Sequence, residues 1–135
     1  MSRSGRPAGE RLKTGKGRTA SSTRWLTRQL NDPYVKAAKE AGWRSRAAFK
    51  LIELDQKFGL LKNAQRVVDL GVAPGGWSQV VRKVSPKAAV VGIDLLPTEP
   101  LDGVTLFEMD FMDDSAPGLL VEALGGAPDL VISDM

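Results

Sequence analysis

The stretch Val67-Val68-Asp69-Leu70-Gly71-Val72-Ala73-Pro74-Gly75-Gly76-Trp77 decides the fold class of this chain. Residues 67–70 form a short apolar run that is typical of a buried strand, and residues 71–76 form a glycine-rich turn. Trp77 and the valines at positions 80, 81 and 84 recur at helical spacing, which predicts an amphipathic helix. A strand, a tight glycine turn and a helix start are typical of the first unit of a nucleotide-binding α/β domain, because glycines let the backbone approach a ligand closely.

The spacing of the glycines leaves alternatives open. It is Gly-x-x-x-Gly-Gly, not the Gly-x-Gly-x-x-Gly of dinucleotide enzymes, and no Gly-Lys-Ser/Thr of a P-loop follows. A purely structural turn is the simpler interpretation of the same residues. One enzyme class that this pattern could fit is a nicotinamide-dependent dehydrogenase. The absence of Gly-x-Gly-x-x-Gly and the run Pro74-Gly75-Gly76-Trp77 argue against this class.

Composition narrows the function classes further. The 135 residues suffice for one domain with a modest core. The chain has no cysteine and no histidine, which excludes disulfides, thiolate nucleophiles, Ser-His-Asp triads and ordinary zinc sites, so we expect no metal site. No apolar run approaches the ~18–20 residues of a membrane span, and no signal-peptide pattern opens the chain. We therefore expect a cytoplasmic protein.

Charge is divided unevenly along the chain. Residues 1–50 hold thirteen Lys and Arg against three Asp and Glu, a net charge of +10, whereas residues 51–135 hold six against thirteen, a net charge of −7. Residues 1–22 carry almost no large apolar side chain, so we expect a disordered basic arm that neutralises RNA phosphates, although a solubilising tail has the same composition. A non-catalytic RNA-binding or ribosome-assembly module is therefore an alternative to an enzyme.

Further strands and helices complete an α/β pattern. Apolar runs predict strands over residues 88–93, 104–109 and 128–134, and their lack of alternation suits a parallel sheet covered on both faces. Helices are expected over residues 34–41, after Asp32 and Pro33, and over residues 45–58 with Ser45 as N-cap. The expected apolar face of the 45–58 helix is Ala47, Leu51, Leu54 and Phe58. A short helix ended by Gly125 and Gly126 is expected to pack through Leu119, Leu120, Ala123 and Leu124.

The later strands each end on an acidic residue: Asp94, Asp110 and Asp134. Carboxyl ends of parallel strands meet at one edge, where ligands of open α/β sheets bind. Asp94 comes nineteen residues after Gly75, which suits a carboxylate that accepts hydrogen bonds from a ribose. Because the glycine-rich turn lies upstream, we favour this role over capping of a turn before Pro97. Asp110 could contact an adenine amino group or shape the pocket floor.

Lys50 is a candidate functional residue because of its position on the predicted 45–58 helix. At about 100° per residue it lies roughly 60° to the side of the apolar stripe, so its stem can pack while its ammonium reaches a cleft. A merely solvated lysine is the commoner case, and periodicity alone does not decide between the two.

The end of the chain is also informative. The sequence stops one residue after Asp134, where a further loop and strand are expected to complete the edge of the sheet. We therefore expect this sequence to be a fragment, with residues 23–135 forming an incomplete domain.

Taken together, several motifs resemble the FtsJ-type heat-shock ribosomal RNA methyltransferases. The matching motifs are Ser22-Thr23-Arg24-Trp25-Leu26, Ser45-Arg46-Ala47-Ala48-Phe49-Lys50-Leu51, Val68 to Gln79, Asp94-Leu95-Leu96-Pro97 and Ser133-Asp134-Met135. The resemblance covers about residues 20–135. It implies a Rossmann-like fold and transfer of a methyl group from S-adenosylmethionine to a ribose 2′-hydroxyl. The substrate it implies is a uridine in the A-loop of 23S ribosomal RNA, in the assembled large (50S) subunit. We also expect that the enzyme has no membrane partner and is a monomer.

The resemblance also implies site residues. It implies a Lys-Asp-Lys-Glu catalytic set in which Lys50 is the first Lys and Asp134 the Asp, while the second Lys and the Glu would lie after Met135. The methyl-donor positions it implies are Gly75, Trp77, Asp94, Asp110 and Asp134. With half of the catalytic set absent, we expect residues 1–135 alone to be inactive.

Overall fold

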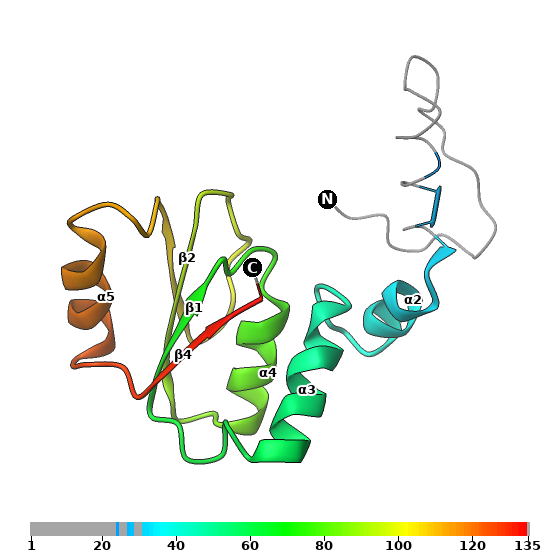
Figure 1. The fold of residues 1–135 in the computed structure, drawn as a ribbon, viewed down its shortest axis with the longest axis horizontal. Helices are drawn as coiled ribbons and strands as arrows, with labels where there is room; N and C mark the ends of the chain where they lie inside the picture. Colours follow the sequence, from blue (N-terminus) through cyan, green and yellow to red (C-terminus); the bar gives the residue numbers. More distant parts are fainter. Residues whose placement is uncertain (1–23, 25–26, 29–30, 135) are drawn as a thin grey trace. The chain divides into compact units, whose positions relative to one another are not determined.

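A computed structural model describes residues 24, 27–28 and 31–134 of the chain, in two compact units. The first unit ends at Arg46, and the second begins at Ala47. The first contains helix α2 (Pro33–Glu40), and the second contains every strand of the described residues (Figure 1). The predicted basic arm, residues 1–22, lies outside the described residues.

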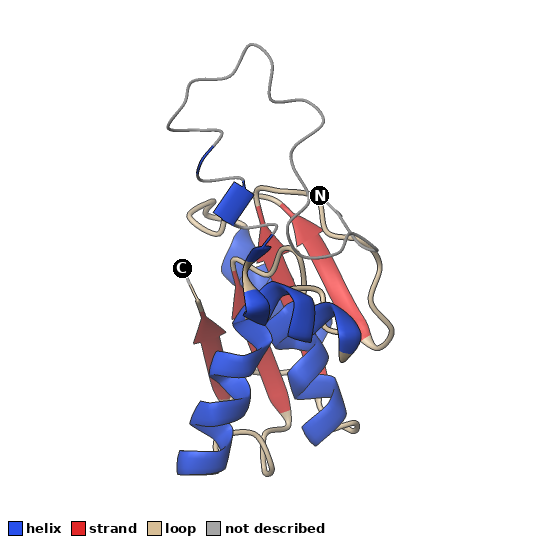
Figure 2. Cartoon of the chain, turned by 90° about the vertical axis from the view of Figure 1, so that its right-hand side faces the viewer, coloured by secondary structure: helices blue, strands red, loops and turns tan. Residues whose placement is uncertain are grey.

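The second unit is built on a four-stranded parallel sheet, as predicted. The strands are β1 (Arg66–Leu70), β2 (Ala89–Asp94), β3 (Val104–Glu108) and β4 (Leu130–Ser133), in the order β3-β2-β1-β4. All of their arrows point the same way in Figure 2. In the register of the central pair, Val67 lies beside Val90, and Leu70 lies beside Ile93. Central β1 is buried at its three middle positions, as expected for a strand covered on both faces.

Helices cover both faces of this sheet. In Figure 1, α5 (Ala116–Leu124) lies on one side, and α4 (Gly76–Val84) with α3 (Ala47–Phe58) lies on the other. On the α5 side, Val68, Val91 and Leu124 form a buried cluster. On the other side, α4 buries Val80 and Val81, and α3 packs against α4. The predicted α/β class with helices on both faces is confirmed.

The ends of two helices follow the capping residues seen in the sequence. Asp32 is the N-cap of α2, and its carboxylate accepts hydrogen bonds from the backbone N–H groups of Tyr34 and Val35, while Pro33 opens the helix. Gly125 ends α5 in a left-handed conformation, with φ of 74°. The capping residues in the sequence therefore predicted these two helix boundaries correctly.

The predicted face of α3 is partly wrong. The helix begins at Ala47 and not at Ser45, and its buried residues are Ala48 and Leu51. Phe58, in the last position, is 62% exposed, because burial of the helix is confined to its first turns. Helical periodicity gives the direction of an apolar stripe but not how far along the helix a partner covers it.

Smaller corrections concern α4, α5 and β3. Val84, at the end of α4, is exposed, and on α5 Leu119 and Ala123 are exposed, whereas Leu120 and Leu124 pack against the sheet. The third strand ends at Glu108, so Asp110 lies two residues beyond it. No helix in the described part of the chain combines the length and apolar character that crossing a membrane requires.

Candidate functional site

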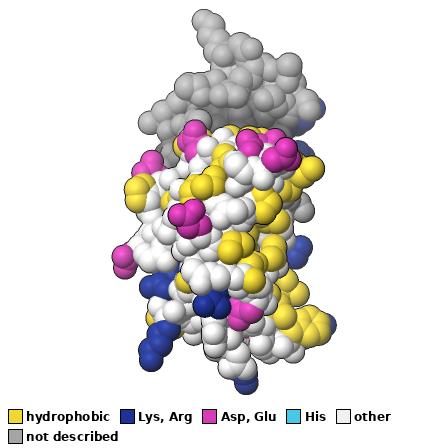
Figure 3. All heavy atoms as spheres, turned by 90° about the vertical axis from the view of Figure 1, so that its left-hand side faces the viewer, with side chains coloured by type: hydrophobic (Ala, Val, Ile, Leu, Met, Phe, Trp, Pro, Cys, Tyr) yellow, Lys and Arg dark blue, Asp and Glu magenta, His cyan; other side chains and the backbone are white. Residues whose placement is uncertain are grey.

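The carboxyl ends of the four strands bring the glycine-rich turn and the predicted acidic residues to one edge of the sheet. Asp94 is the last residue of β2, and Asp134 directly follows β4. On the face shown in Figure 3, Asp and Glu side chains gather toward the upper end, which is the end toward which the strands run. Several Lys and Arg side chains lie toward the lower end of the same face. On this face, the end toward which the strands run is therefore acidic.

The glycine-rich turn is held against the tip of β2 by backbone hydrogen bonds. The N–H groups of Gly71 and Val72 both donate to the carbonyl oxygen of Ile93, at 2.8 and 3.2 Å. Gly75, the N-cap of α4, has φ of 118°, which favours glycine. Gly92 faces the turn so closely that a Cβ there would lie 2.5 Å from the Val72 side chain. The close packing of turn and strand explains why β2 has a glycine in its interior.

Asp94 joins the turn to the loop after β2. Its Oδ2 accepts a hydrogen bond from the N–H of Ala73 at 2.9 Å, and its Oδ1 accepts one from the N–H of Leu96 at 2.9 Å. Of two roles for this residue, turn capping and ribose binding, the sequence favours the second. The structure shows the first role directly. A carboxylate retains further lone pairs after two such bonds, so the second stays a prediction.

Asp69 is a buried carboxyl group in β1, two residues before the first glycine of the turn. It is 1% exposed, its Oδ2 accepts a hydrogen bond from the hydroxyl of buried Ser78 at 2.8 Å, and its Oδ1 is buried with no hydrogen-bond partner among the described residues. An unpaired buried acceptor is uncommon and costs free energy, which makes it a candidate contact for a ligand donor.

The surroundings of Asp69 change its ionisation. The pKa of Asp69 is raised to about 7, chiefly by burial, while the hydrogen bond from Ser78 opposes the rise. The negative charges of Asp134 and Asp94 contribute to the rise of the pKa, each by less than burial does. Three carboxyl groups from β1, β2 and the end of β4 thus interact at one edge, and a positively charged ligand would relieve their repulsion.

Trp77 contributes to the packing between two helices. Its indole Nε1 donates a hydrogen bond to the carbonyl oxygen of Ala47 at 2.7 Å, and the residue is 7% exposed. The bond links the first turn of α4, just after the glycine-rich turn, to the first turn of α3. The role of Trp77 toward a ligand stays a prediction, but its structural role is clear.

Lys50 lies in that first turn of α3, and its side chain is exposed. The bond between Trp77 and Ala47 therefore fixes the part of α3 that carries Lys50. Lys50 and Asp134 form no ion pair with each other, as judged within residues 31–134. The predicted catalytic pairing of these two side chains stays a prediction.

Asp110 accepts a hydrogen bond from the N–H of Met112 at 2.9 Å in the loop after β3. The neighbouring N–H of Met109 donates to the backbone carbonyl of Asp94 at 2.9 Å. The loop after β3 is thereby tied to the tip of β2, and Asp110 lies near the edge predicted for it.

The sequence did not predict a role for Asp69 or Ser78. The available signal was a carboxylate inside an otherwise apolar strand, one residue before Leu70 and two before the first glycine of the turn. Such a residue must be either neutral or partnered when buried. Its partner comes from α4, nine residues later, and only the fold brings the two together.

The fold is that of a parallel α/β protein with helices on both faces of the sheet, and carboxyl groups gather at the carboxyl ends of its strands. A model of the FtsJ-like methyltransferase family matches residues 43–135. The chain belongs to the FtsJ-like methyltransferase family.

Related proteins agree with this assignment. The chain is similar to proteins named ribosomal RNA large subunit methyltransferase E, with 76% identity in Novosphingobium aromaticivorans and 71% in Erythrobacter litoralis, each over 135 residues. Those alignments cover 100% of this chain and 61% of each relative. The chain thus spans about three-fifths of the length of these relatives. A crystal structure described as that of a ribosomal RNA methyltransferase from Plasmodium falciparum matches with a TM-score of 0.61 and 33% identity, over 69% of this chain and 56% of that one.

Proposed function

We propose that this chain is the donor-binding part of an enzyme that transfers a methyl group from S-adenosylmethionine to a ribose 2′-hydroxyl of large-subunit ribosomal RNA. The observation that carries the proposal is the glycine-rich turn fixed at the carboxyl ends of parallel strands, beside three carboxyl groups. The names of the relatives support ribosomal RNA as the substrate. The resemblance of the motifs adds the finer expectation, a uridine of the A-loop in the assembled 50S subunit, methylated in the cytoplasm by a monomeric enzyme.

The residues present suit this donor. S-adenosylmethionine carries a sulfonium and an ammonium, and an acidic edge with one unpaired buried carboxyl oxygen on Asp69 favours positive charge and N–H donors. Asp94 suits the ribose hydroxyls of the donor, and Asp110 suits its adenine end. The turn around Gly75 and Trp77 suits the main body of the donor. When bound, the donor supplies an electrophilic methyl carbon on sulfur.

The reaction asks two things of the protein. It must hold the 2′-oxygen in line with the methyl carbon, and it must accept the hydroxyl proton as that oxygen becomes bonded to carbon. We assign the proton to Lys50, which must present a neutral amine to accept it. Asp134 would orient Lys50 while favouring its charged form, so a second cation near Lys50 is needed to favour the neutral amine.

Binding of the donor is tested by calorimetric titration of the chain with S-adenosylmethionine and, separately, NADH. We expect binding of the first and none of the second. Asp94→Asn should weaken donor binding at least about tenfold, since the amide cannot accept all the bonds that the carboxylate accepts. The matched control is Asp102→Asn, an exposed acid in the loop before β3, which should leave the affinity unchanged. Tight NADH binding without S-adenosylmethionine binding would end the proposal.

The catalytic role of Lys50 needs an enzyme of the relatives' full length. Methyl transfer to large ribosomal subunits should fall at least about 10²-fold in Lys50→Ala, because the base is lost, while donor affinity is retained. Undiminished activity would remove Lys50 from the mechanism. Absence of any methyl transfer by the unaltered full-length enzyme would instead favour a binding module.

A further inference from the structure

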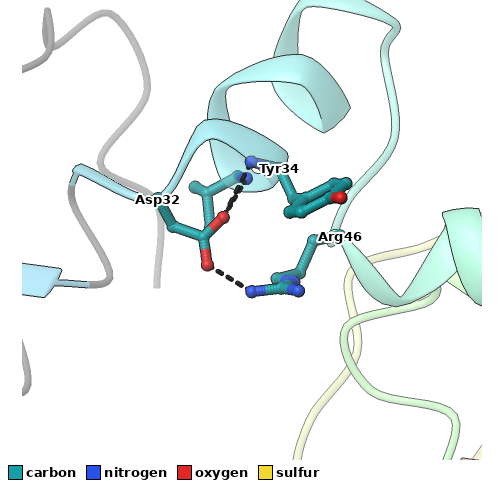
Figure 4. Close-up of polar contacts among 4 residues, drawn as sticks. Asp32, Tyr34 and Arg46 are labelled. Atoms are coloured by element: carbon teal, nitrogen blue, oxygen red, sulfur yellow. Dashed lines mark hydrogen bonds and ion pairs between the residues drawn. The ribbon is translucent and has the colours of Figure 1, made fainter.

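The first unit contains a fixed pair of an aromatic ring and a guanidinium group. The guanidinium carbon of Arg46 lies 4.9 Å from the centre of the Tyr34 ring, and Arg46 also pairs with the carboxylate of Asp32. Figure 4 shows the three side chains together, with Arg46 beside the ring and Asp32 at the start of α2. Asp32 has two tasks here, because it caps α2 and holds Arg46.

This pair is accessible to solvent. Tyr34 is 56% exposed, and the Arg46 side chain is 48% exposed, whereas Asp32 is largely covered at 16%. The residue that α2 buries is Ala38, whereas more than half of the Tyr34 surface faces solvent. The ion pair holds the guanidinium plane in place before any ligand arrives, so little side-chain entropy remains to be lost on binding.

Charge indicates which kind of ligand suits the pair. The described residues of the first unit include six Lys and Arg, namely Arg24, Arg28, Lys36, Lys39, Arg44 and Arg46, against two acids, Asp32 and Glu40. On the face shown in Figure 3, Asp and Glu side chains gather at the strand-end edge of the second unit, which attracts phosphate groups less than the basic first unit does. A polyanion is therefore favoured by the first unit. Aromatic rings stack on unpaired nucleobases, and guanidinium groups bond phosphates and stack on bases.

We propose that Tyr34 and Arg46 form a contact site for an unpaired nucleotide of RNA, in which the Tyr34 ring stacks on the base and Arg46 binds the adjoining phosphate. This site deepens the proposed function, since it rests on ribosomal RNA as the substrate. It adds a place on the chain, outside the donor site, where single-stranded RNA is recognised. Double-stranded RNA, whose bases are already stacked, gains nothing from Tyr34.

The chain offers a matched control for this site. Lys57 lies 5.5 Å from the centre of the Phe58 ring in α3, and Phe58 is 62% exposed. This second cation–aromatic pair has similar exposure, but an ammonium is a point charge without a plane to stack. Phe58→Leu therefore removes an exposed aromatic ring without touching the proposed RNA contact.

The test measures binding of the whole chain to a fluorescent single-stranded RNA of about a dozen nucleotides and to a duplex of the same sequence. Tyr34→Leu should weaken single-strand binding about 5- to 100-fold with an unchanged salt slope, and leave duplex binding unchanged. Tyr34→Phe and Phe58→Leu should stay within about twofold of wild type, because each retains the Tyr34-position ring. Arg46→Gln should weaken binding and lower the salt slope by about 0.7, the value for one phosphate contact on a single strand.

Ultraviolet crosslinking with 4-thiouridine RNA provides an independent measurement in the unaltered chain. The crosslinked peptide should contain Tyr34. The proposal is overturned if Tyr34→Leu binds single strands like wild type, if Phe58→Leu loses as much affinity as Tyr34→Leu, or if crosslinks occur but all map elsewhere. Binding of S-adenosylmethionine by Tyr34→Leu is measured in parallel. If Tyr34→Leu retains donor binding and its RNA affinity equals that of the wild type, only the Tyr34 and Arg46 site is overturned. If the wild type does not bind S-adenosylmethionine, only the proposed donor is overturned.

Discussion

At the residue scale, Asp69 shows how a single buried carboxyl group can link stability to ligand binding. Its pKa of about 7 means that it changes charge near neutral pH, where its neighbours Asp94 and Asp134 add to the cost of ionisation. A bound cation would favour the ionised form. The same group is therefore a source of instability in the free protein and a source of affinity when a positive ligand is present.

This reasoning predicts the pH dependence of stability. Between pH 4 and 7 the folded chain holds a proton on Asp69 that the unfolded chain, with a normal pKa of 3.8, releases. The free energy of unfolding should therefore fall as the pH rises through this window, by up to about 4 kcal/mol from this group. Urea denaturation at pH 5 and at pH 8, followed by circular dichroism, measures the change.

The variant Asp69→Asn cannot ionise, so its stability should decline much less between the two pH values. Asp114→Asn, which changes an exposed loop acid, serves as the control and should follow the wild type. Parallel declines in Asp69→Asn and wild type would show that Asp69 does not titrate in this window.

At the element scale, the contact between β2 and the glycine-rich turn is the tightest feature of the site. A Cβ at Gly92 would approach Val72 Cγ2 to 2.5 Å and Val72 Cβ to 2.7 Å. The second distance matters most, because the Cβ atom moves only with the backbone of the turn. A methyl group on this strand would therefore displace the glycine-rich turn itself.

We expect Gly92→Ala to destabilise the chain by about 1–3 kcal/mol and to weaken donor binding. Gly118→Ala is the matched control, since Gly118 lies in α5 with no heavy atom within 4 Å of a Cβ built there. That substitution should stabilise the chain by about 0.5–1 kcal/mol, because alanine favours a helix. Thermal melting of both variants is the measurement, and an unchanged melting temperature for Gly92→Ala would contradict the close contact.

The elements also show what the sequence could predict. The strands were found to within two residues at each end, because a short apolar run between glycine and proline signals has few alternatives. Burial of individual side chains was predicted less well. Phe58 and Leu119 fit helical periodicity and are nevertheless exposed, since periodicity does not say where along a helix its partner ends.

The contacts that the sequence did not predict are pairings between side chains that lie apart in the chain. Asp69 with Ser78, and Asp32 with Arg46, join side chains from different elements. Their chemistry is visible in the sequence, but whether they meet depends on the paths of the intervening turns. The positions of Asp94 and Asp134 could be predicted because parallel strands bring their carboxyl ends together whatever the turns do.

At the scale of the whole molecule, positive and negative charges are segregated along the chain. Residues 1–50 are strongly basic and residues 51–135 are acidic. An enzyme that holds a cationic donor and a polyanionic substrate at once benefits from such a division, because each ligand meets a potential of the opposite sign.

Deleting residues 1–22 tests this division. The segment carries six Lys and Arg and one Glu, so its loss should weaken RNA binding at low salt and lower the salt slope by up to about 4. The affinity for S-adenosylmethionine should not change. An unaltered salt slope would mean that the segment is a solubilising tail.

The two hydrogen bonds of Asp94 have a consequence for engineering. One carboxylate receives an N–H from the turn after β1 and another from the loop after β2, so it acts as a tie between two segments. Attempts to redesign the choice of cofactor usually begin by replacing the acid that faces the sugar. Asp94 is the acid that we propose for this role, and its replacement would also free the N–H groups of Ala73 and Leu96. The glycine-rich turn would then lose its link to the loop after β2 before any new specificity was gained. Redesign would have to start from the neighbours of Asp94 and leave the carboxylate in place.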